Sequence, residues 1–226
     1  MPQSNVESLA KARALYYDFF AGLFLYELLS ERGSVLLEQI RILKENSLNE
    51  SDKVHFELLE SEITHKGIKG LLDEYTRTFI LPFDTPLPNT PLPQRKRRDS
   101  NEMESNIHSQ SVGRVMLYLS HYTEGCLNGK SLLKARGLTK QSTFRLNSKE
   151  CKESEEHLGF LLLLMRHLLL SNDENDKSLS IEVANELVLP LGEYVSKALQ
   201  QREDLSYYAS IGELLKSFLQ VESALL

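Results

Sequence analysis

The sequence predicts an all-α protein, and three observations lead to this prediction. Apolar residues recur every three to four positions over most of the chain, which is the period of an amphipathic helix. No segment alternates apolar and polar residues convincingly, as a half-buried strand would. Five of the seven prolines lie within residues 82–98, which leaves the rest of the chain free to form helices. We therefore expect a single-domain bundle of about eight helices over residues 1–226, with a proline-rich central loop at about residues 82–110.

The expected helices follow from the positions of the apolar residues. The first, residues 6–29, carries a broad aromatic face that includes Tyr16 and Phe20, and we expect this face in the core. Seven further segments show the same period: residues 34–45, 51–80 with a break near Gly67 or Gly70, 111–125, 130–136, 155–170, 178–200 and 204–224. Residues 139–152 are expected to form an irregular connection.

Charge and cysteine content narrow the class of protein. The net charge of −6 argues against general nucleic-acid binding, because phosphate contacts need a basic face. The two cysteines, Cys126 and Cys151, form no C-x-x-C pair, so we expect reduced thiols. The N-terminal residues lack the positive charge of an export signal, and the apolar run at residues 15–29 is too short to cross a bilayer. These observations favour a cytoplasmic protein with no stable membrane insertion.

The sequence contains little evidence of a conventional catalytic motif. Residues 125–131 resemble a phosphate loop but place three residues instead of four before the Gly-Lys-Ser, and no strand precedes them. Gly125 and Gly129 fit helix stop signals better, with Lys130 opening the next helix. The six histidines show no metal-ligand spacing, and no nucleophile elbow is present. We expect no catalytic residue, no metal and no cofactor.

The basic run of Arg95, Lys96, Arg97 and Arg98 has two interpretations. It can be a solvated surface, whose field the following acids dilute, or an arm that binds phosphate groups. Its role stays open.

Residues 153–170 pose the main question of function. Three carboxylates and a histidine precede a segment that is almost wholly apolar. One interpretation is structural: Ser154 caps a helix, and the acids stabilise its first turn through the exposed N–H groups. The other is functional: the acids and His157 lie at the mouth of an apolar groove and bind a partner there.

Four blocks resemble the TorD/DmsD/NarJ family of redox-enzyme maturation chaperones. Residues 12–27 are similar to the aromatic-rich opening helix of that family, and residues 74–82 resemble its E-Y-x-x-L-F-x-G-P signature. Residues 153–165 resemble its E-P-x-D-H-L-G helix start, and residues 187–194 and 207–219 its closing helix pair. The order and spacing of these blocks agree along nearly the whole chain.

The resemblance implies a cytosolic, non-enzymatic chaperone. It would bind the twin-arginine signal peptide and the apo form of a molybdenum-cofactor oxidoreductase, such as a formate dehydrogenase or an N-/S-oxide reductase, and delay export until the cofactor is inserted. The implied client-binding residues are Glu155 and Glu156 toward the cationic end of the peptide, His157 as an orienting group, Tyr75, Phe79 and Pro82 in the groove wall, and Tyr16 and Phe20 beneath it. The chain would be a monomer or a domain-swapped dimer.

Two alternatives remain beside this interpretation. The first is a NarJ-like assembly factor for a membrane-bound reductase that is not exported. The second is a nucleotide-responsive enzyme that uses residues 125–131.

Overall fold

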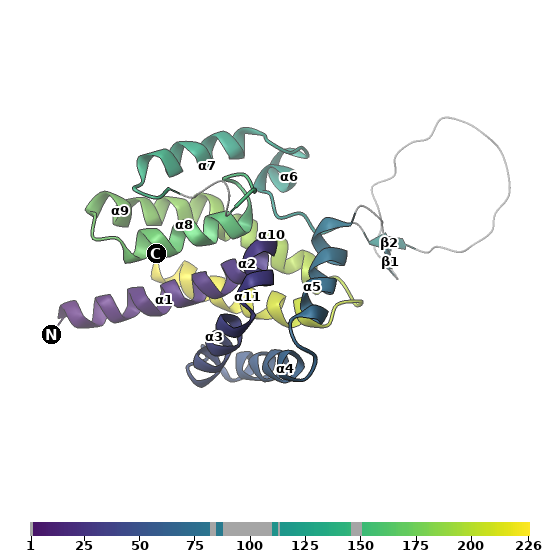
Figure 1. The fold of residues 1–226 in the computed structure, drawn as a ribbon. Helices are drawn as coiled ribbons and strands as arrows, with labels where there is room; N and C mark the ends of the chain where they lie inside the picture. The colour runs from purple at the N-terminus through teal and green to yellow at the C-terminus, as the bar shows by residue number, and fades with distance from the viewer. Residues whose placement is uncertain (1, 82–84, 88–109, 113, 146–150) are drawn as a thin grey trace, which may run out of the picture.

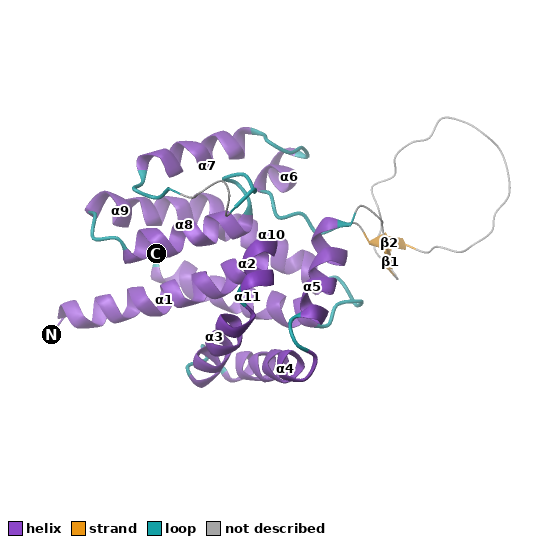
Figure 2. Cartoon of the chain, in the orientation of Figure 1, coloured by secondary structure: helices purple, strands orange, loops and turns teal. Residues whose placement is uncertain are grey.

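The computed structural model describes residues 2–81, 85–87, 110–112, 114–145 and 151–226, and these residues are almost entirely helical (Figures 1 and 2). The elements are α1 (Pro2–Phe24), α2 (Tyr26–Glu31), α3 (Gly33–Glu45), α4 (Glu50–Lys66), α5 (Lys69–Tyr75), the π-helical turn η1 (Thr76–Ile80), β1 (Thr85–Leu87), β2 (Gln110–Val112), α6 (Leu119–Glu124), α7 (Lys130–Gln141), α8 (Leu158–Leu170), α9 (Glu174–Val183), the π-helical turn η2 (Ala184–Val188), α10 (Leu189–Gln200) and α11 (Tyr207–Leu225). The short strands β1 and β2 pair antiparallel. The predicted all-α class is confirmed. Most of the predicted proline-rich loop, with its basic run, lies outside the described residues.

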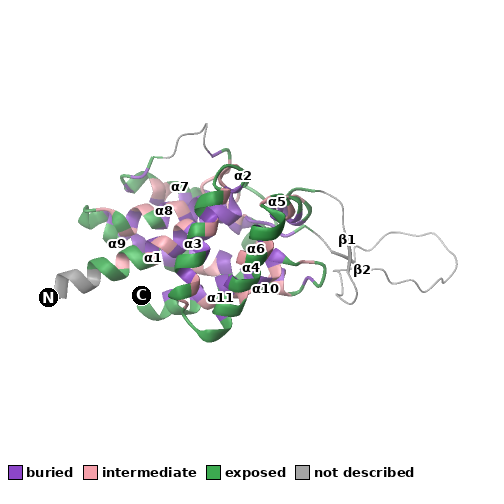
Figure 3. Ribbon diagram, turned by 60° about the horizontal axis from the view of Figure 1, so that its bottom comes forward, coloured by how far each residue is buried: buried purple, intermediate pink, exposed green. Residues whose placement is uncertain are grey.

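The centre of the fold is α1, which packs against α8 and, through its side chains, against α11 (Figure 1). The aromatic side chains of α1 are buried, with Phe19, Phe20 and Phe24 fully inaccessible to solvent. Phe20 packs on Phe218 of α11, with their ring centroids 5.5 Å apart. Buried segments, purple in Figure 3, concentrate on these central helices, whereas the outer face of α4 is exposed. The aromatic first helix predicted from the sequence is therefore the core element that it was expected to be.

Close approach of α1 and α8 requires a glycine at the start of α8. A Cβ atom built on Gly159 would lie 2.9 Å from the carbonyl oxygen of Phe24 and 2.5 Å from Cγ of Leu25. Both distances are below normal van der Waals separation, so any larger residue would push the helices apart. The same contact lies where α1 gives way to α2, because Leu25 has an extended backbone.

Local sequence explains several helix ends. The side chain of Asn49 accepts a hydrogen bond from the N–H of Asp52 at 2.8 Å and so caps the start of α4. Gly67 ends α4 with a φ of 69°, a left-handed value that glycine adopts without steric penalty. The predicted break near Gly67 or Gly70 is thus confirmed at Gly67.

The predicted helix over residues 178–200 forms, but with a widened turn. Pro190 lies at the first turn of α10, and the π-helical turn η2 immediately precedes it. Proline has no N–H group and its ring clashes with the carbonyl four residues earlier in a regular α-helix. The π-helical turn shifts that carbonyl and lets the chain continue from α9 through α10.

The prediction of a helix over residues 111–125 is largely wrong. The helix α6 covers Leu119–Glu124, and residues 114–117 are neither helix nor strand. Two tertiary hydrogen bonds compete with helix formation here: Val115 N–H donates to the Thr78 carbonyl at 3.0 Å, and Leu158 N–H donates to the Leu117 carbonyl at 2.8 Å. The segment therefore joins η1 to the start of α8.

Two buried carboxylates connect elements that are distant in sequence. Glu222 of α11 accepts hydrogen bonds from Arg13 Nε at 2.8 Å and from the Tyr17 hydroxyl at 2.7 Å, both on α1. Glu74 of α5 accepts from the N–H groups of Ser206 at 3.0 Å and Tyr208 at 2.7 Å, which caps the start of α11. The glutamate of the 74–82 block thus has a structural role. Among the described residues, no helix is both long enough and apolar enough to cross a bilayer.

Candidate functional site

A pocket of about 180 Å³ opens where α2, η1, residues 115–118 and residues 153–157 meet. Its inner wall is apolar and consists of Tyr75, Phe79, Val115, Met116 and Leu117, which are all buried. The exposed side chains of Tyr26 and Ile80 form part of its lining as well. The pocket therefore offers apolar surface both inside and at its edge.

The polar side of the pocket contains two carboxylates. Glu27, in the first turn of α2, and Glu153, before α8, both line it and are half-buried. The hydroxyl of Tyr118 donates a hydrogen bond to Glu153 Oε2. Burial raises the pKa of Tyr118, and the hydrogen bond to Glu153 adds to this rise because it stabilises the protonated phenol.

Both carboxylates affect the pKa of Tyr75. Burial is the main cause of its raised pKa, and the negative charges of Glu153 and Glu27 raise it further. Its hydroxyl donates to the Phe24 carbonyl at 3.3 Å. Both carboxylates line the same pocket as Tyr75.

His157 lines the pocket and is 2% exposed. Burial lowers the pKa of His157 to about 3, so the ring is neutral near pH 7. Its Nδ1 accepts a hydrogen bond from the N–H of Gly159 at 3.1 Å, which caps the start of α8. An accepting Nδ1 requires the ring proton on Nε2, and this N–H makes no hydrogen bond to any described residue. The ring of Tyr118 packs edge-on against His157, with the centroids 5.0 Å apart.

The acids of residues 153–156 thus have three different environments. Glu153 lines the pocket, whereas Glu155 forms an ion pair with Arg136, Nε to Oε2 at 3.0 Å. Glu156 is fully buried and accepts hydrogen bonds from the N–H groups of Ser120 at 2.8 Å and Asn128 at 3.1 Å, and from the Ser120 hydroxyl. Glu156 therefore holds the loop between α6 and α7.

The expected cap of α8 is also different. Ser154 was predicted to cap this helix, with the acids in its first turn, but α8 begins at Leu158 and its first turn contains no acid. The acids precede the helix and make tertiary contacts instead. This detail of the structural interpretation is wrong, because His157 provides the cap.

The structure distributes the predicted client-binding residues unevenly. Tyr75, Phe79 and His157 line the pocket. Tyr16 and Phe20 pack against Phe218 in the core, and Glu155 and Glu156 make the contacts described above. Pro82 lies outside the described residues. The client-binding roles of these residues stay predictions.

Sequence reasoning did not assign Glu27 and Tyr118 to the site. Glu27 ends the aromatic block of residues 12–27, where an acid after an apolar run offered a signal. Tyr118 offered none, since its segment was predicted to be helical. Its place depends on hydrogen bonds between residues far apart in sequence.

The loop at residues 125–131 does not present a free phosphate cradle in the described part of the chain. The carboxylate of Glu124 accepts hydrogen bonds from the N–H groups of Lys130 at 2.7 Å and Ser131 at 2.9 Å. These amides at the start of α7 are the groups that would bind a phosphate. Gly125 ends α6 with a φ of 68°, which confirms it as a helix stop.

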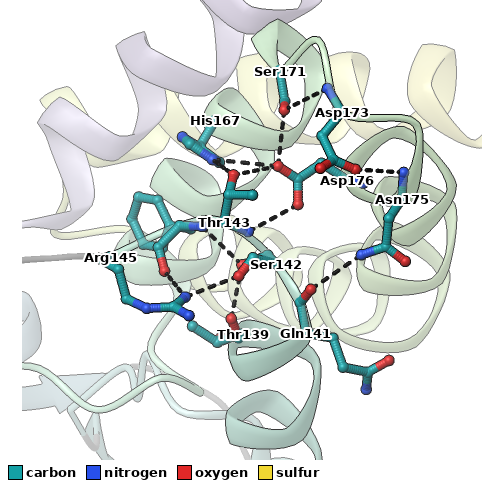
Figure 4. Close-up of polar contacts among 11 residues, drawn as sticks. Thr139, Gln141, Ser142, Thr143, Arg145, His167, Ser171, Asp173, Asn175 and Asp176 are labelled. Atoms are coloured by element: carbon teal, nitrogen blue, oxygen red, sulfur yellow. Dashed lines mark hydrogen bonds and ion pairs between the residues drawn. The ribbon is translucent and has the colours of Figure 1, made fainter.

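A second polar cluster joins the end of α7 to α8 and α9 (Figure 4). Buried Asp176 accepts hydrogen bonds from the Thr143 N–H at 3.0 Å, the Thr143 hydroxyl at 2.5 Å and the Ser171 hydroxyl at 2.8 Å. His167 Nε2 lies 2.8 Å from the same Thr143 hydroxyl. Because this hydroxyl gives its proton to Asp176, it accepts from His167, which cannot then act as its base. The cluster has a structural role, because it holds the segment after α7 against α8 and α9.

Among the described residues, no group of three or more His, Cys, Asp or Glu side chains could hold a metal ion.

Residues 108–204 match the family described as nitrate reductase delta subunit. Over these residues the chain is similar to the nitrate reductase delta subunit family. No curated protein and no solved structure was found to match the chain.

The match to the nitrate reductase delta subunit family confirms the resemblance to the NarJ and TorD chaperones. Proteins of this family are maturation chaperones of redox enzymes without catalytic activity of their own, and they bind catalytic subunits of molybdoenzymes such as nitrate reductase. The matched region includes the pocket residues from Val115 to His157. The α2 and η1 walls of the pocket lie outside it.

Proposed function

We propose that the chain is a cytoplasmic chaperone that binds the twin-arginine signal peptide and the apo form of a molybdoenzyme catalytic subunit, and delays export until the cofactor is inserted. The observation that carries this proposal is the pocket, which combines an apolar wall with the carboxylates of Glu27 and Glu153. A signal peptide combines the complementary features, a basic segment followed by an apolar one. The family match supports the proposal at the level of redox-enzyme maturation.

The surface next to the pocket suits the apolar segment of such a peptide. Tyr26, Ile80 and Leu81 are 40%, 44% and 37% exposed, although each is a large hydrophobic residue. Covering such side chains contributes about 25 cal/mol per Å² of apolar surface. Loss of peptide freedom offsets much of this gain, so we expect micromolar affinity, which allows the client to be released.

A peptide titration tests the proposal. Isothermal titration of a leader peptide with an Arg-Arg pair should show micromolar binding, and the same peptide with Lys-Lys should bind at least about five-fold more weakly, because guanidinium binds carboxylates in a bidentate way. Absence of binding to either peptide would contradict the proposal.

Equal affinity for the two peptides would support the second candidate, an assembly factor for a non-exported reductase. The observation that favours this candidate is the matched family, which is named after the nitrate reductase delta subunit. Its client would present an N-terminal peptide without the twin arginine.

A matched pair of variants tests whether the pocket is the binding surface. Ile80 lines the pocket and is 44% exposed, and Val54 on α4 is 54% exposed and does not line it. Ile80→Asp should weaken leader binding at least ten-fold, because it removes apolar contact and buries a charge. Val54→Asp should leave the affinity unchanged, and both variants should stay folded. Equal effects of the two substitutions would place binding elsewhere.

A further inference from the structure

The charge of the pocket is not balanced by the residues that line it. The lining contains Glu27 and Glu153 but no lysine or arginine. His157, the remaining basic residue there, is neutral, since burial lowers its pKa to about 3. Among the described residues, neither carboxylate takes part in an ion pair. Two half-buried carboxylates of this kind attract a cation more strongly than fully solvated ones do.

The negative charges of Glu27 and Glu153 also affect neighbouring buried groups. Burial raises the pKa of the Cys151 thiol, and the charges of Glu153 and Glu27 add to the rise. The same two charges act on Tyr75 in the pocket wall. Because Glu27 and Glu153 line the same pocket, a cation bound in it is attracted by both, without first breaking an existing ion pair.

The size of the pocket limits what can enter. An apolar cavity of roughly 150 Å³ binds one benzene molecule. A pocket of about 180 Å³ therefore has room for the end of one arginine or lysine side chain. Tyr118 donates to Glu153 Oε2 and leaves Oε1 for a ligand.

His157 adds a hydrogen-bond donor to the lining of the pocket. Its side chain is 2% exposed and lines the pocket, and its Nε2–H has no acceptor among the described residues. Water in the pocket or an oxygen atom of a ligand can accept a hydrogen bond from this donor. A cationic side chain offers no acceptor, whereas the carbonyl of the residue that carries it does.

We infer that the pocket receives one cationic side chain of a bound peptide, placed between Glu27 and Glu153, while His157 Nε2–H donates to a backbone carbonyl of the same peptide. This inference rests on the proposed function and adds to it that the chaperone reads a single basic residue here. The other basic residue of a pair then lies outside the pocket, where water screens its charge.

Peptides with citrulline test the inference, because citrulline keeps the shape of arginine and removes its charge. Each arginine of the leader pair is replaced in turn, and affinities are measured by isothermal titration. Replacement at one position should weaken binding about ten-fold or more, and at the other position less than three-fold. The large effect should disappear in the Glu27→Gln/Glu153→Gln variant and persist in Glu155→Gln, whose carboxylate does not line the pocket. Equal effects at both positions, or a large effect that persists in the double variant, would overturn the inference.

A small probe separates this inference from the proposed function. N-acetylargininamide carries one guanidinium and backbone carbonyls but no leader sequence. Titrated into the full chain labelled on methionine methyl groups, it should shift the NMR signal of Met116 in a saturable way, whereas N-acetylcitrullinamide should not. A shift of the Met116 signal without any leader binding would contradict the proposed function but support the cation site. Leader binding without any charge dependence, or no response to either probe, would overturn the cation site.

Discussion

Replacement of Glu156 by alanine provides the sharpest test of how residues 153–157 work. The carboxylate of Glu156 is fully buried and accepts hydrogen bonds from two backbone N–H groups and one hydroxyl in the segment from Ser120 to Asn128. Alanine removes the acceptor and leaves these donors buried without partners. The variant should therefore be clearly less stable than the wild type.

The size of the effect follows from the contacts. Hydrogen bonds to a charged group contribute about 1.5–3 kcal/mol each, and they are not additive within one network. Each buried donor left without its acceptor costs about 1–3 kcal/mol, so the loss of the acceptor for three donors should destabilise by about 3–5 kcal/mol in total. For a chain of 226 residues, about 2–4 °C per kcal/mol applies, so the melting temperature should fall by about 6–20 °C.

Thermal unfolding followed by circular dichroism at 222 nm measures this effect. Glu155→Ala is the matched control, because Glu155 is the adjacent acid and its contact with Arg136 is a partly exposed ion pair. Such pairs contribute about 0–1 kcal/mol, so the control should melt within about 3 °C of the wild type. At 15 °C, where both variants are folded, Glu156→Ala should change leader affinity less than three-fold, since its carboxylate does not line the pocket.

The opposite pattern would refute this reasoning. If Glu156→Ala melts within about 3 °C of the wild type and loses leader binding more than ten-fold, Glu156 contacts the client directly. The structural role assigned to it here would then be wrong.

Two further predictions concern α8. Gly159→Ala should destabilise by about 1–3 kcal/mol, because its Cβ would collide with the Phe24 carbonyl. Gly137→Ala in α7, where nothing lies within 4 Å, should stabilise by about 0.5–1 kcal/mol; chemical denaturation compares the two, and equal effects would refute the close approach. His157 has a folded pKa of about 3, below its usual value near 6.5, so the unfolded chain binds more protons between these values. Its contribution to stability is complete above about pH 6.5 and falls by up to about 1.4 kcal/mol per pH unit below it. His157→Asn should flatten this fall between pH 6.5 and 5.5, and an unchanged slope would contradict a buried neutral ring.

Most helix positions could be predicted from the sequence, because a helix that packs on a core has apolar residues at every third or fourth position. The predicted helix at residues 6–29 appears as α1 and α2, with the break at Leu25. The predicted helix at residues 178–200 appears as α9, η2 and α10. These divisions raise the number of elements above the expected eight without changing the fold class. Neither break has a strong local signal, since Leu25 is an ordinary helix-forming residue.

Part of the candidate site could be predicted from the sequence. An aromatic residue of the 74–82 block, Phe79, and the histidine of the 153–165 block, His157, do meet at one pocket. Which acids accompany them was not accessible, because Glu153, Glu155 and Glu156 differ little in local sequence. The donors that surround each carboxylate decide its role, and those donors come from other elements.

The sequence by itself determined that this chain folds as a helical bundle around an aromatic first helix, because the periodic burial of apolar side chains is a local property of the chain. It also indicated the resemblance to the chaperone family, through short blocks that keep their order, and the family match over residues 108–204 supports this resemblance. The tertiary structure alone decided that residues 115–118 form a non-helical segment beside the pocket, that Glu156 supports a loop, and that Glu27 and Glu153 line the same pocket. Each of these depends on hydrogen bonds and packing between residues far apart in sequence, where a competing partner outweighs local preference.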